Sequence, residues 1–481
     1  MKFQGKVMKK ILLSVMLVAL FDATDAQMPV EQNIMLQIQQ AEKLIKDNPT
    51  AATAAFDEIL KGKNKKNPGI LVEIGEAYLK AGNVDEAAKY AAKAKEADNK
   101  SAIAYLLSGD IYLAKDDASK ASSEYNQAIY FDENCSDAYL KYANVYKGVN
   151  PQLSIEMLEK LKNKKPDDTR IEKMMGDIYY SMGKYKSAAE KYDTYMTNGT
   201  PSETDFARYA TLLYLNKNYE KSKSIADRGL SVNPDNHVMK RLAMYNDDEL
   251  KKYSEGLEIA NKFFTNANDS DLVYLDYVYY GRLLASTNKY DEALTQYQKA
   301  ITMDEQHPDL YKEMSGIYEK KRDFSNAISY YKKYIDGLEG KEDPSELFSY
   351  GRLNYYAASD STDKAKQQLY LDEADNIFSK VAEKVPDNYL GSFWRARVNS
   401  LKDPETSQGL AKPYYEAALA ILEKNPNSAT SFKSQIIECN SYLGYYYYVK
   451  GDNAQSKLYW NKILEIDPQN KTAFKALEGI K

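Results

Sequence analysis

Arginine and tyrosine side chains offer the most distinctive recognition chemistry in this sequence. The segment Phe393–Ser400 reads FWRARVNS and holds one of only two tryptophans, and Tyr445–Tyr448 is a run of four tyrosines. An arginine can pair with a carboxylate through two parallel hydrogen bonds, and aromatic rings supply rigid contact area. These segments favour recognition of a partner that carries carboxylates. Two alternatives stay open: Trp394 can be a core residue beside solvated arginines, and only Tyr445 and Tyr448 are expected to face away from the packed side of their helix.

The residue types that catalysis and metal binding require are scarce. The chain has two histidines, His237 and His307, and two cysteines, Cys135 and Cys439. It contains no Gly-rich phosphate loop, no HExxH segment and no GxSxG segment, and its many carboxylates fall at solvated helix positions. We therefore expect no enzymatic activity, no catalytic residues, no cofactor and no metal. The cysteines are far apart in the sequence, so two buried thiols are favoured over a disulfide.

Composition is consistent with amphipathic helices in a soluble protein. Of 481 residues, 28% are charged and 43% are hydrophobic, and the mean hydropathy is −0.63. Tyrosine is unusually abundant, at 43 residues against 13 phenylalanines. A tyrosine can bury its ring and keep its hydroxyl in water, which suits half-buried contacts between helices. The net charge of −5 argues against a dedicated nucleic-acid binder.

A period of 34 residues organises most of the chain. Within Ala102–Cys135, Gly109 is followed three positions later by an aromatic residue, and Ala121 lies in a second amphipathic segment. Gly75 and Ala87 precede Gly109 and Ala121 by one period each. This pattern resembles the tetratricopeptide repeat, a helix–turn–helix unit of that length. The residues assigned as landmarks of the repeats are Gly75, Tyr78, Gly109, Tyr112, Gly176, Tyr179, Gly281, Gly351, Gly444 and Tyr447.

The resemblance implies an all-α fold, a right-handed α-solenoid (superhelix) of about eleven helix pairs. The small landmark residues let the two helices of a pair approach closely, and the aromatic residue one turn after the glycine fills the remaining gap. A larger residue at Gly109 would overpack this contact, at a cost of roughly 1–3 kcal/mol. A single pair cannot bury its apolar stripe alone, so neighbouring pairs must stack.

The sequence predicts five segments. They are a signal peptide (1–26), a degenerate N-terminal helical pair (27–67), the N-terminal half of the repeat array (68–270), its C-terminal half with lengthened repeats (271–470), and a capping helix (471–481). The extra length of the ninth repeat lies in Ala357–Leu371, as a longer loop or an extended helix, and that of the tenth lies around Lys402–Leu410.

The first 27 residues are typical of a secretory leader. Lys9 and Lys10 precede an apolar run from Ile11 to Phe21, and Ala26 ends a region of small residues. The apolar run has about half the length that spans a bilayer, and translation can start at Met1 or at Met8. No cysteine follows the run, which disfavours a lipid anchor. We therefore expect an exported, soluble, periplasmic protein without a transmembrane segment.

The resemblance also implies where a partner would bind. In the tetratricopeptide family the first helix of each unit lines a concave groove, and the residue after the glycine is among those that face it. In the first five repeats these residues are Glu76, Asp110, Asn144, Asp177 and Thr211; later they are Tyr245, Arg282, Gly316, Arg352, Arg397 and Tyr445. The predicted partner-binding residues are Tyr245, Arg282, Arg352, Tyr355, Arg397, Tyr445 and Tyr448. The alternative is that each arginine pairs with a Glu or Asp of the adjacent repeat.

These observations favour a non-enzymatic scaffold or adaptor that binds a protein or an extended peptide in the concave groove. The leader and the tyrosine-rich repeats look like those of periplasmic repeat proteins of Gram-negative bacteria, which usually serve envelope assemblies. The alternative is a nutrient-binding protein that resembles the outer-membrane glycan-capture family, which also contains such repeats. Proteins of that family normally carry a lipidated cysteine and exposed tryptophans, and neither is evident here. The sequence leaves the partner and the oligomeric state open.

Overall fold

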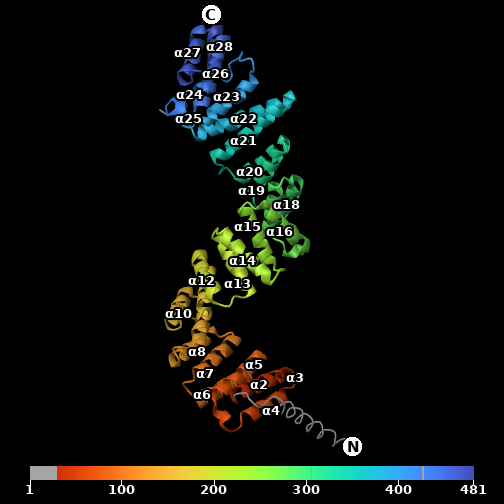
Figure 1. The fold of residues 1–481 in the computed structure, drawn as a ribbon, viewed down its shortest axis with the longest axis vertical. Helices are drawn as coiled ribbons and strands as arrows, with labels where there is room; N and C mark the ends of the chain where they lie inside the picture. Colours follow the sequence, from red (N-terminus) through yellow and green to blue (C-terminus); the bar gives the residue numbers. More distant parts are fainter. Residues whose placement is uncertain (1–29, 305, 425–426, 481) are drawn as a thin grey trace, which may run out of the picture. The chain divides into compact units, whose positions relative to one another are not determined.

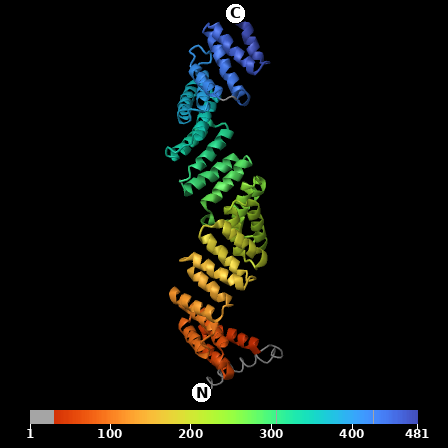
Figure 2. The same cartoon turned by 90° about the vertical axis from the view of Figure 1, so that its left-hand side faces the viewer.

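The computed structural model describes residues 30–304, 306–424 and 427–480, which form α-helices, two 3-10 helices and connecting turns without any strand. The chain divides into two compact units, an N-terminal unit of residues 1–242 and a C-terminal unit of residues 243–481. Within each unit the helices lie side by side in pairs that stack in chain order, as Figures 1 and 2 show. The expected signal peptide lies outside the described residues.

The N-terminal unit begins with α2 (Val30–Glu42), α3 (Leu44–Asp47), α4 (Pro49–Ile59) and the 3-10 helix η1 (Gly62–Lys66). Five helix pairs follow: α5 (Pro68–Lys80) with α6 (Val84–Ala97), α7 (Ala102–Ala114) with α8 (Ala118–Phe131), α9 (Ser136–Tyr146) with α10 (Pro151–Lys164), α11 (Arg170–Ser181) with α12 (Tyr185–Asn198), and α13 (Glu203–Leu215) with α14 (Tyr219–Val232).

Six further pairs complete the array, and the first of them starts at the end of the N-terminal unit. They are α15 (His237–Glu249) with α16 (Tyr253–Asn266), α17 (Tyr274–Ser286) with α18 (Tyr290–Met303), α19 (Asp309–Lys320) with α20 (Phe324–Gly337), α21 (Pro344–Asp360) with α22 (Lys364–Lys384), α23 (Leu390–Lys402) with α24 (Lys412–Glu423), and α26 (Lys433–Val449) with α27 (Asn453–Ile466). Three short elements accompany them: η2 (Asp269–Asp271), α25 (Ser428–Ser431) and the terminal α28 (Lys471–Gly479). The predicted all-α array of about eleven helix pairs is confirmed.

Most pairs share one type of turn. The first helix ends, one residue adopts a left-handed backbone conformation, and the next residue caps the second helix. In the first pair the left-handed residue is Gly82, and the side chain of Asn83 accepts a hydrogen bond from the backbone N–H of Glu86. The same turn is made without glycine at Asp116, Lys217, Lys251, Asn288 and Arg322. A side chain carries a steric cost in that conformation, so these turns are strained relative to the glycine version.

Most of the glycine landmarks seat an aromatic ring that comes from the second helix of the same pair, whereas Gly75 lies against the side chain of Leu107 in the next pair. A Cβ atom placed at Gly109 would lie 2.2 Å from the ring of Tyr125, sixteen positions later. The same spacing joins Gly176 to Tyr192, Gly281 to Tyr297, and Gly444 to Trp460. The sequence-based expectation that the aromatic residue three positions after the glycine fills this gap is therefore incomplete. Tyr125 is fully buried, whereas Tyr112 is half-buried.

The two lengthened repeats accommodate their extra residues in different ways. In the ninth repeat the helices themselves are longer, because α21 has 17 residues and α22 has 21. In the tenth repeat the extra residues form a loop between α23 and α24. The buried carboxylate of Asp403 organises this loop by accepting hydrogen bonds from the backbone N–H groups of Gln408 (2.9 Å) and Gly409 (2.7 Å). Burial alone would raise the pKa of Asp403, but these hydrogen bonds together outweigh it and hold the pKa below its ordinary value.

Neither cysteine forms a disulfide; Cys135 is half-buried and Cys439 is buried. Burial raises the pKa of the Cys439 thiol, so this thiol is held in its protonated form. Within the part of the chain that the structure describes, every helix is either too short or too polar to cross a membrane.

Candidate functional site

The first helices of neighbouring repeats are joined by ion pairs that involve the residue after the landmark. Asp110 pairs with Lys141, and Asp177 pairs with Arg208 (3.0 Å between Oδ1 and Nη1). A tyrosine hydroxyl of the second helix donates to the same carboxylate: Tyr125 to Asp110 at 2.7 Å, and Tyr192 to Asp177 at 2.6 Å. We call this group of tyrosine, carboxylate and cation an inter-repeat bridge. The predicted groove positions of the second and fourth repeats are therefore occupied by structural contacts.

Arg282 belongs to an inter-repeat bridge in which the charges stand in the opposite order. Its Nε donates to Glu313 Oε1 of the next repeat at 2.9 Å, its Nη2 donates to the same oxygen, and the hydroxyl of Tyr297 donates to Glu313 Oε2 at 2.8 Å. Burial alone would lower the pKa of Arg282, but hydrogen bonds and the charge of Glu313 outweigh it and raise the pKa. Arg282 therefore follows the structural alternative.

Arg397 is paired in the same way across the lengthened tenth repeat. Its Nε and Nη2 donate to the two carboxylate oxygens of Glu438 at 2.8 Å and 2.6 Å. The hydroxyl of Tyr415 donates to Glu438 Oε1 at 3.0 Å. The guanidinium also lies over the rings of Phe393 and Trp394, at 4.7 Å and 4.9 Å from their centroids.

Arg352 is the exception among the three predicted arginines. Its side chain is exposed, and among the described residues no carboxylate oxygen lies within ion-pair distance of its guanidinium. Its polar contact is the hydroxyl of Tyr356 at 3.3 Å from Nη2. The guanidinium lies 5.3 Å from the ring centroid of Tyr356 and 5.8 Å from that of Trp394. Arg352 thus keeps a free bidentate donor on an aromatic support.

Trp394 is the buried aromatic residue over which the guanidinium of Arg352 lies. The ring is 8% exposed and is surrounded by four other rings, with centroid distances of 5.2 Å to Tyr355, 5.7 Å to Phe348, 5.7 Å to Phe378 and 6.2 Å to Tyr356. The core alternative therefore holds for this tryptophan. We define the Arg352 surface as the side chains of Arg352, Tyr355, Tyr356 and Arg397, which come from α21 and α23 and reach solvent around the ring.

The remaining predicted residues do not join this surface as a group. Tyr245 is 4% exposed, its hydroxyl donates to Asp276 at 2.7 Å, and its ring stacks on Tyr279. It therefore lies in the interior and offers no contact area to a partner. Tyr445 and Tyr448 point away from the packed side of α26 and are 44% and 49% exposed.

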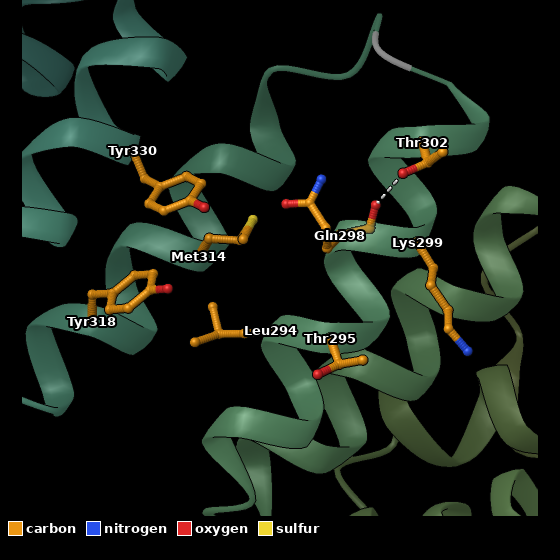
Figure 3. Close-up of a pocket in the computed structure, with 8 residues that line it drawn as sticks. All are labelled: Leu294, Thr295, Gln298, Lys299, Thr302, Met314, Tyr318 and Tyr330. Atoms are coloured by element: carbon orange, nitrogen blue, oxygen red, sulfur yellow. Dashed lines mark hydrogen bonds between the residues drawn. The ribbon is translucent and has the colours of Figure 1, made fainter.

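A separate hollow, which the sequence did not indicate, lies between α18, α19 and α20. A cavity of about 420 Å³ lies between the seventh and eighth repeats. Leu294 and Gln298 of α18 face Met314 and Tyr318 of α19 and Tyr330 of α20 across it (Figure 3). Lys299 is the charged side chain of its lining. The cavity is shallow and mostly uncharged, so it offers less chemistry for recognition than the Arg352 surface does.

Two spacings in the sequence indicate the contacts of Arg282 that were not predicted. Glu313 follows Arg282 by 31 positions, the same spacing that separates Asp110 from Lys141, and Tyr297 follows Gly281 by sixteen. Both spacings recur along the chain, so they could have identified Arg282 as a structural residue. The repeat after Arg352 carries Trp394 rather than an acid against the guanidinium, and this difference leaves Arg352 unpaired.

Comparisons with known proteins agree with this repeat architecture. Residues 43–108, 102–135 and 281–345 match family models described as tetratricopeptide repeat. The solved C-terminal part of a TPR repeat-containing protein from Cytophaga hutchinsonii is 30% identical to this chain; the match covers 56% of this chain and 99% of that one, with a TM-score of 0.48. A TPR repeat-containing protein of Methanocaldococcus jannaschii is 25% identical over 83% of this chain and 70% of its own length.

Anaphase-promoting complex subunit 7 of Homo sapiens is 25% identical over 130 residues, or 27% of this chain. The chain spans about a fifth of the length of that relative, because the match covers 21% of it. None of the family models that match describes a catalytic domain.

Proposed function

Because the chain belongs to the tetratricopeptide-repeat family, whose members generally serve as protein–protein interaction scaffolds, we propose that it is a non-enzymatic scaffold that binds a protein or an extended peptide at the Arg352 surface. The observation that carries this proposal is the unpaired guanidinium of Arg352. Two of the three predicted arginines already hold carboxylates of the neighbouring repeat, and Arg352 does not.

The chemistry of the surface defines the segment it would bind. A carboxylate from an Asp or Glu side chain, or from a chain terminus, would take the two parallel donors of Arg352. A neighbouring apolar or aromatic side chain of the partner would lie against Tyr355 and Tyr356, which are half-buried and already fixed by ring contacts. Fixed rings lose little conformational freedom on binding, so they support affinity.

The test is a selection of random peptides displayed on phage against the purified chain. Enriched peptides should carry an Asp or Glu next to an aromatic or large apolar residue. Arg352→Glu should weaken their binding by about tenfold or more, because a charge-assisted pair is lost and a repulsive one replaces it. Arg228→Glu is the matched control, since Arg228 is also exposed and lies over a ring, that of Phe206 at 5.4 Å. Equal binding by wild type and Arg352→Glu would refute this site.

The cell compartment is part of the proposal. The leader-like segment at residues 1–26 supports export to the periplasm, where the scaffold would serve an envelope assembly. Expression of the chain in a Gram-negative host should give a periplasmic product that has lost about the first 26 residues, as mass spectrometry of the cell fractions would show. A full-length product in the cytoplasmic fraction would contradict this proposal.

The glycan-binding alternative receives no support from the tryptophans. Trp394 and Trp460 are 8% and 6% exposed, and both lie in contacts between helices. A sugar-binding platform needs an aromatic face that is open to the ligand, so neither residue can supply one without repacking.

A further inference from the structure

A cavity of about 710 Å³ opens near the start of the N-terminal unit, between the end of α4, the 3-10 helix η1 and the helices α5 and α6. Its apolar lining comes from Leu60, Leu71 and Ala97, of which Leu71 is buried and the other two are half-buried. A volume of this size is within the range of pockets that hold small organic ligands, which is roughly 300–1,000 Å³.

The segment that carries the cavity rim is held in place at both ends. The side-chain amide of Asn64 donates to the backbone carbonyl of Ile59 at 2.9 Å, which ties η1 to the end of α4. The side chain of Asn67 accepts hydrogen bonds from the backbone N–H groups of Gly69 and Ile70, which starts α5 directly after η1. The rim is therefore an ordered part of the fold.

The rim carries more cations than anions. Four lysines line the cavity, Lys61, Lys65, Lys66 and Lys93, against two carboxylates, Asp57 and Glu96. Lys61 pairs with Glu58 at 2.6 Å. The other three have no carboxylate within 4.0 Å among residues 30–304, 306–424 and 427–480, and the ammonium of Lys93 lies 4.6 Å from the ring centroid of Tyr90.

We propose that this cavity binds a small organic anion that combines an apolar body with a carboxylate. The apolar body would lie on Leu60 and Leu71, and the carboxylate would be held by the ammonium groups of Lys65, Lys66 and Lys93. Burial of the apolar body supplies a favourable free energy that an inorganic ion lacks. The ligand is thus distinguished both from a simple anion and from a neutral apolar molecule.

The test uses a fluorescent fatty acid, 11-(dansylamino)undecanoic acid, titrated into the full chain. Wild type should bind it saturably, and the triple variant Lys65→Glu, Lys66→Glu, Lys93→Glu should bind about tenfold more weakly or worse. The milder triple variant with Gln at the same positions should lie between the two, which provides a second measurement if the Glu variant loses its fold by circular dichroism. A control triple at exposed lysines of the same unit, Lys147→Glu, Lys184→Glu, Lys186→Glu, should bind within about twofold of wild type.

Two further ligands test the chemistry. The methyl ester of the probe should bind at least about fivefold more weakly than the acid, because it has no charge to pair. Acetate at a concentration of a few millimolar should not displace the probe, because acetate cannot fill the apolar part. The proposal is overturned if wild type shows no saturable binding, or if the Glu and Gln variants at Lys65, Lys66 and Lys93 both bind the probe as wild type does. It is also overturned if the ester binds as tightly as the acid, or if acetate displaces the probe.

Discussion

At the level of single residues, the distance between the two helices of a repeat depends on a glycine and on the ring that covers it. In Gly109→Ala, the new Cβ would meet the ring of Tyr125 at 2.2 Å, and this ring is fully buried and held by the hydrogen bond from its hydroxyl to Asp110. We expect the variant to lose roughly 1–3 kcal/mol of stability. The measurement is the midpoint of urea unfolding followed by circular dichroism.

Gly316→Ala is the matched control for that substitution. Gly316 lies inside α19, and a Cβ atom there would have no neighbour within 4 Å. Alanine is the better helix former, so this variant should gain about 0.5–1 kcal/mol. If the two alanine variants shifted the unfolding midpoint in the same direction, the role assigned to the ring of Tyr125 would be wrong.

One carboxyl group in the C-terminal unit should make stability depend on pH. Burial raises the pKa of Asp248 to about 7; Arg282 opposes this rise, and Glu249 and Glu313 add to it. The folded state therefore binds more protons than the unfolded state between about pH 4 and pH 7, so stability falls as the pH rises through that window. Asp248→Asn keeps the group neutral and should be at least about 1 kcal/mol more stable than wild type at pH 8.

The difference between Asp248→Asn and wild type should shrink as the pH is lowered toward 4, where both side chains are neutral. Urea unfolding at pH 4.5, 6 and 8 measures this. Asp167→Asn, at an exposed position of the N-terminal unit, is the matched control. A constant difference between Asp248→Asn and wild type at all three values would rule out titration of this group as its cause.

At the level of secondary-structure elements, the turns between paired helices contain strain that a substitution can remove. Lys217 has a φ of 59° in the turn between α13 and α14, and its side chain is exposed. Lys217→Gly should therefore stabilise the protein by about 0.5–1 kcal/mol, because glycine adopts this conformation without a steric cost. Lys160→Gly, at an exposed position inside α10, should instead cost about 1 kcal/mol. Thermal unfolding of both variants tests these two predictions, and destabilisation by Lys217→Gly would contradict the strain assigned to the turn.

The positions of the lengthened repeats could be predicted from the sequence, but their shape could not be decided in advance. The period of small residues located the extra length near Ala357–Leu371 and Lys402–Leu410. Residues Lys364–Leu371 contain neither glycine nor proline, so the helix simply continues through them. The segment after Lys402 contains Pro404 and Gly409, and Gly409 has a φ of 76°, so it forms a loop.

The candidate site could be predicted only in part, for a physical reason. The period identified the positions that follow each landmark, and Arg352 is one of them. Whether an arginine there is free depends on which side chain the next repeat places against it: Glu313 against Arg282, Glu438 against Arg397, and Trp394 against Arg352. The exposure of Tyr245 also depends on its neighbours, because Asp276 and Tyr279 hold its ring inside the fold.

At the level of the whole molecule, the array builds the inter-repeat bridge in two charge orders. In the second and fourth repeats the acid follows the landmark and the base comes 31 positions later, whereas Arg282 and Glu313 reverse this order. A tyrosine hydroxyl donates to the carboxylate in both cases. The shared backbone geometry of the repeats therefore accepts either order, and each bridge contributes locally between neighbouring repeats.

The exchange of the two charges at one bridge tests this interpretation directly. Arg282→Glu alone and Glu313→Arg alone should each cost about 1–3 kcal/mol, because each places like charges together next to the hydroxyl of Tyr297. The double variant recreates the order found at Asp110 and Lys141, so it should recover to within about 1 kcal/mol of wild type, a coupling that a double-mutant cycle in urea unfolding would measure. If the double variant lost the sum of the two single costs, the bridge at Arg282 would depend on its own charge order, and the repeats would not be interchangeable at this position.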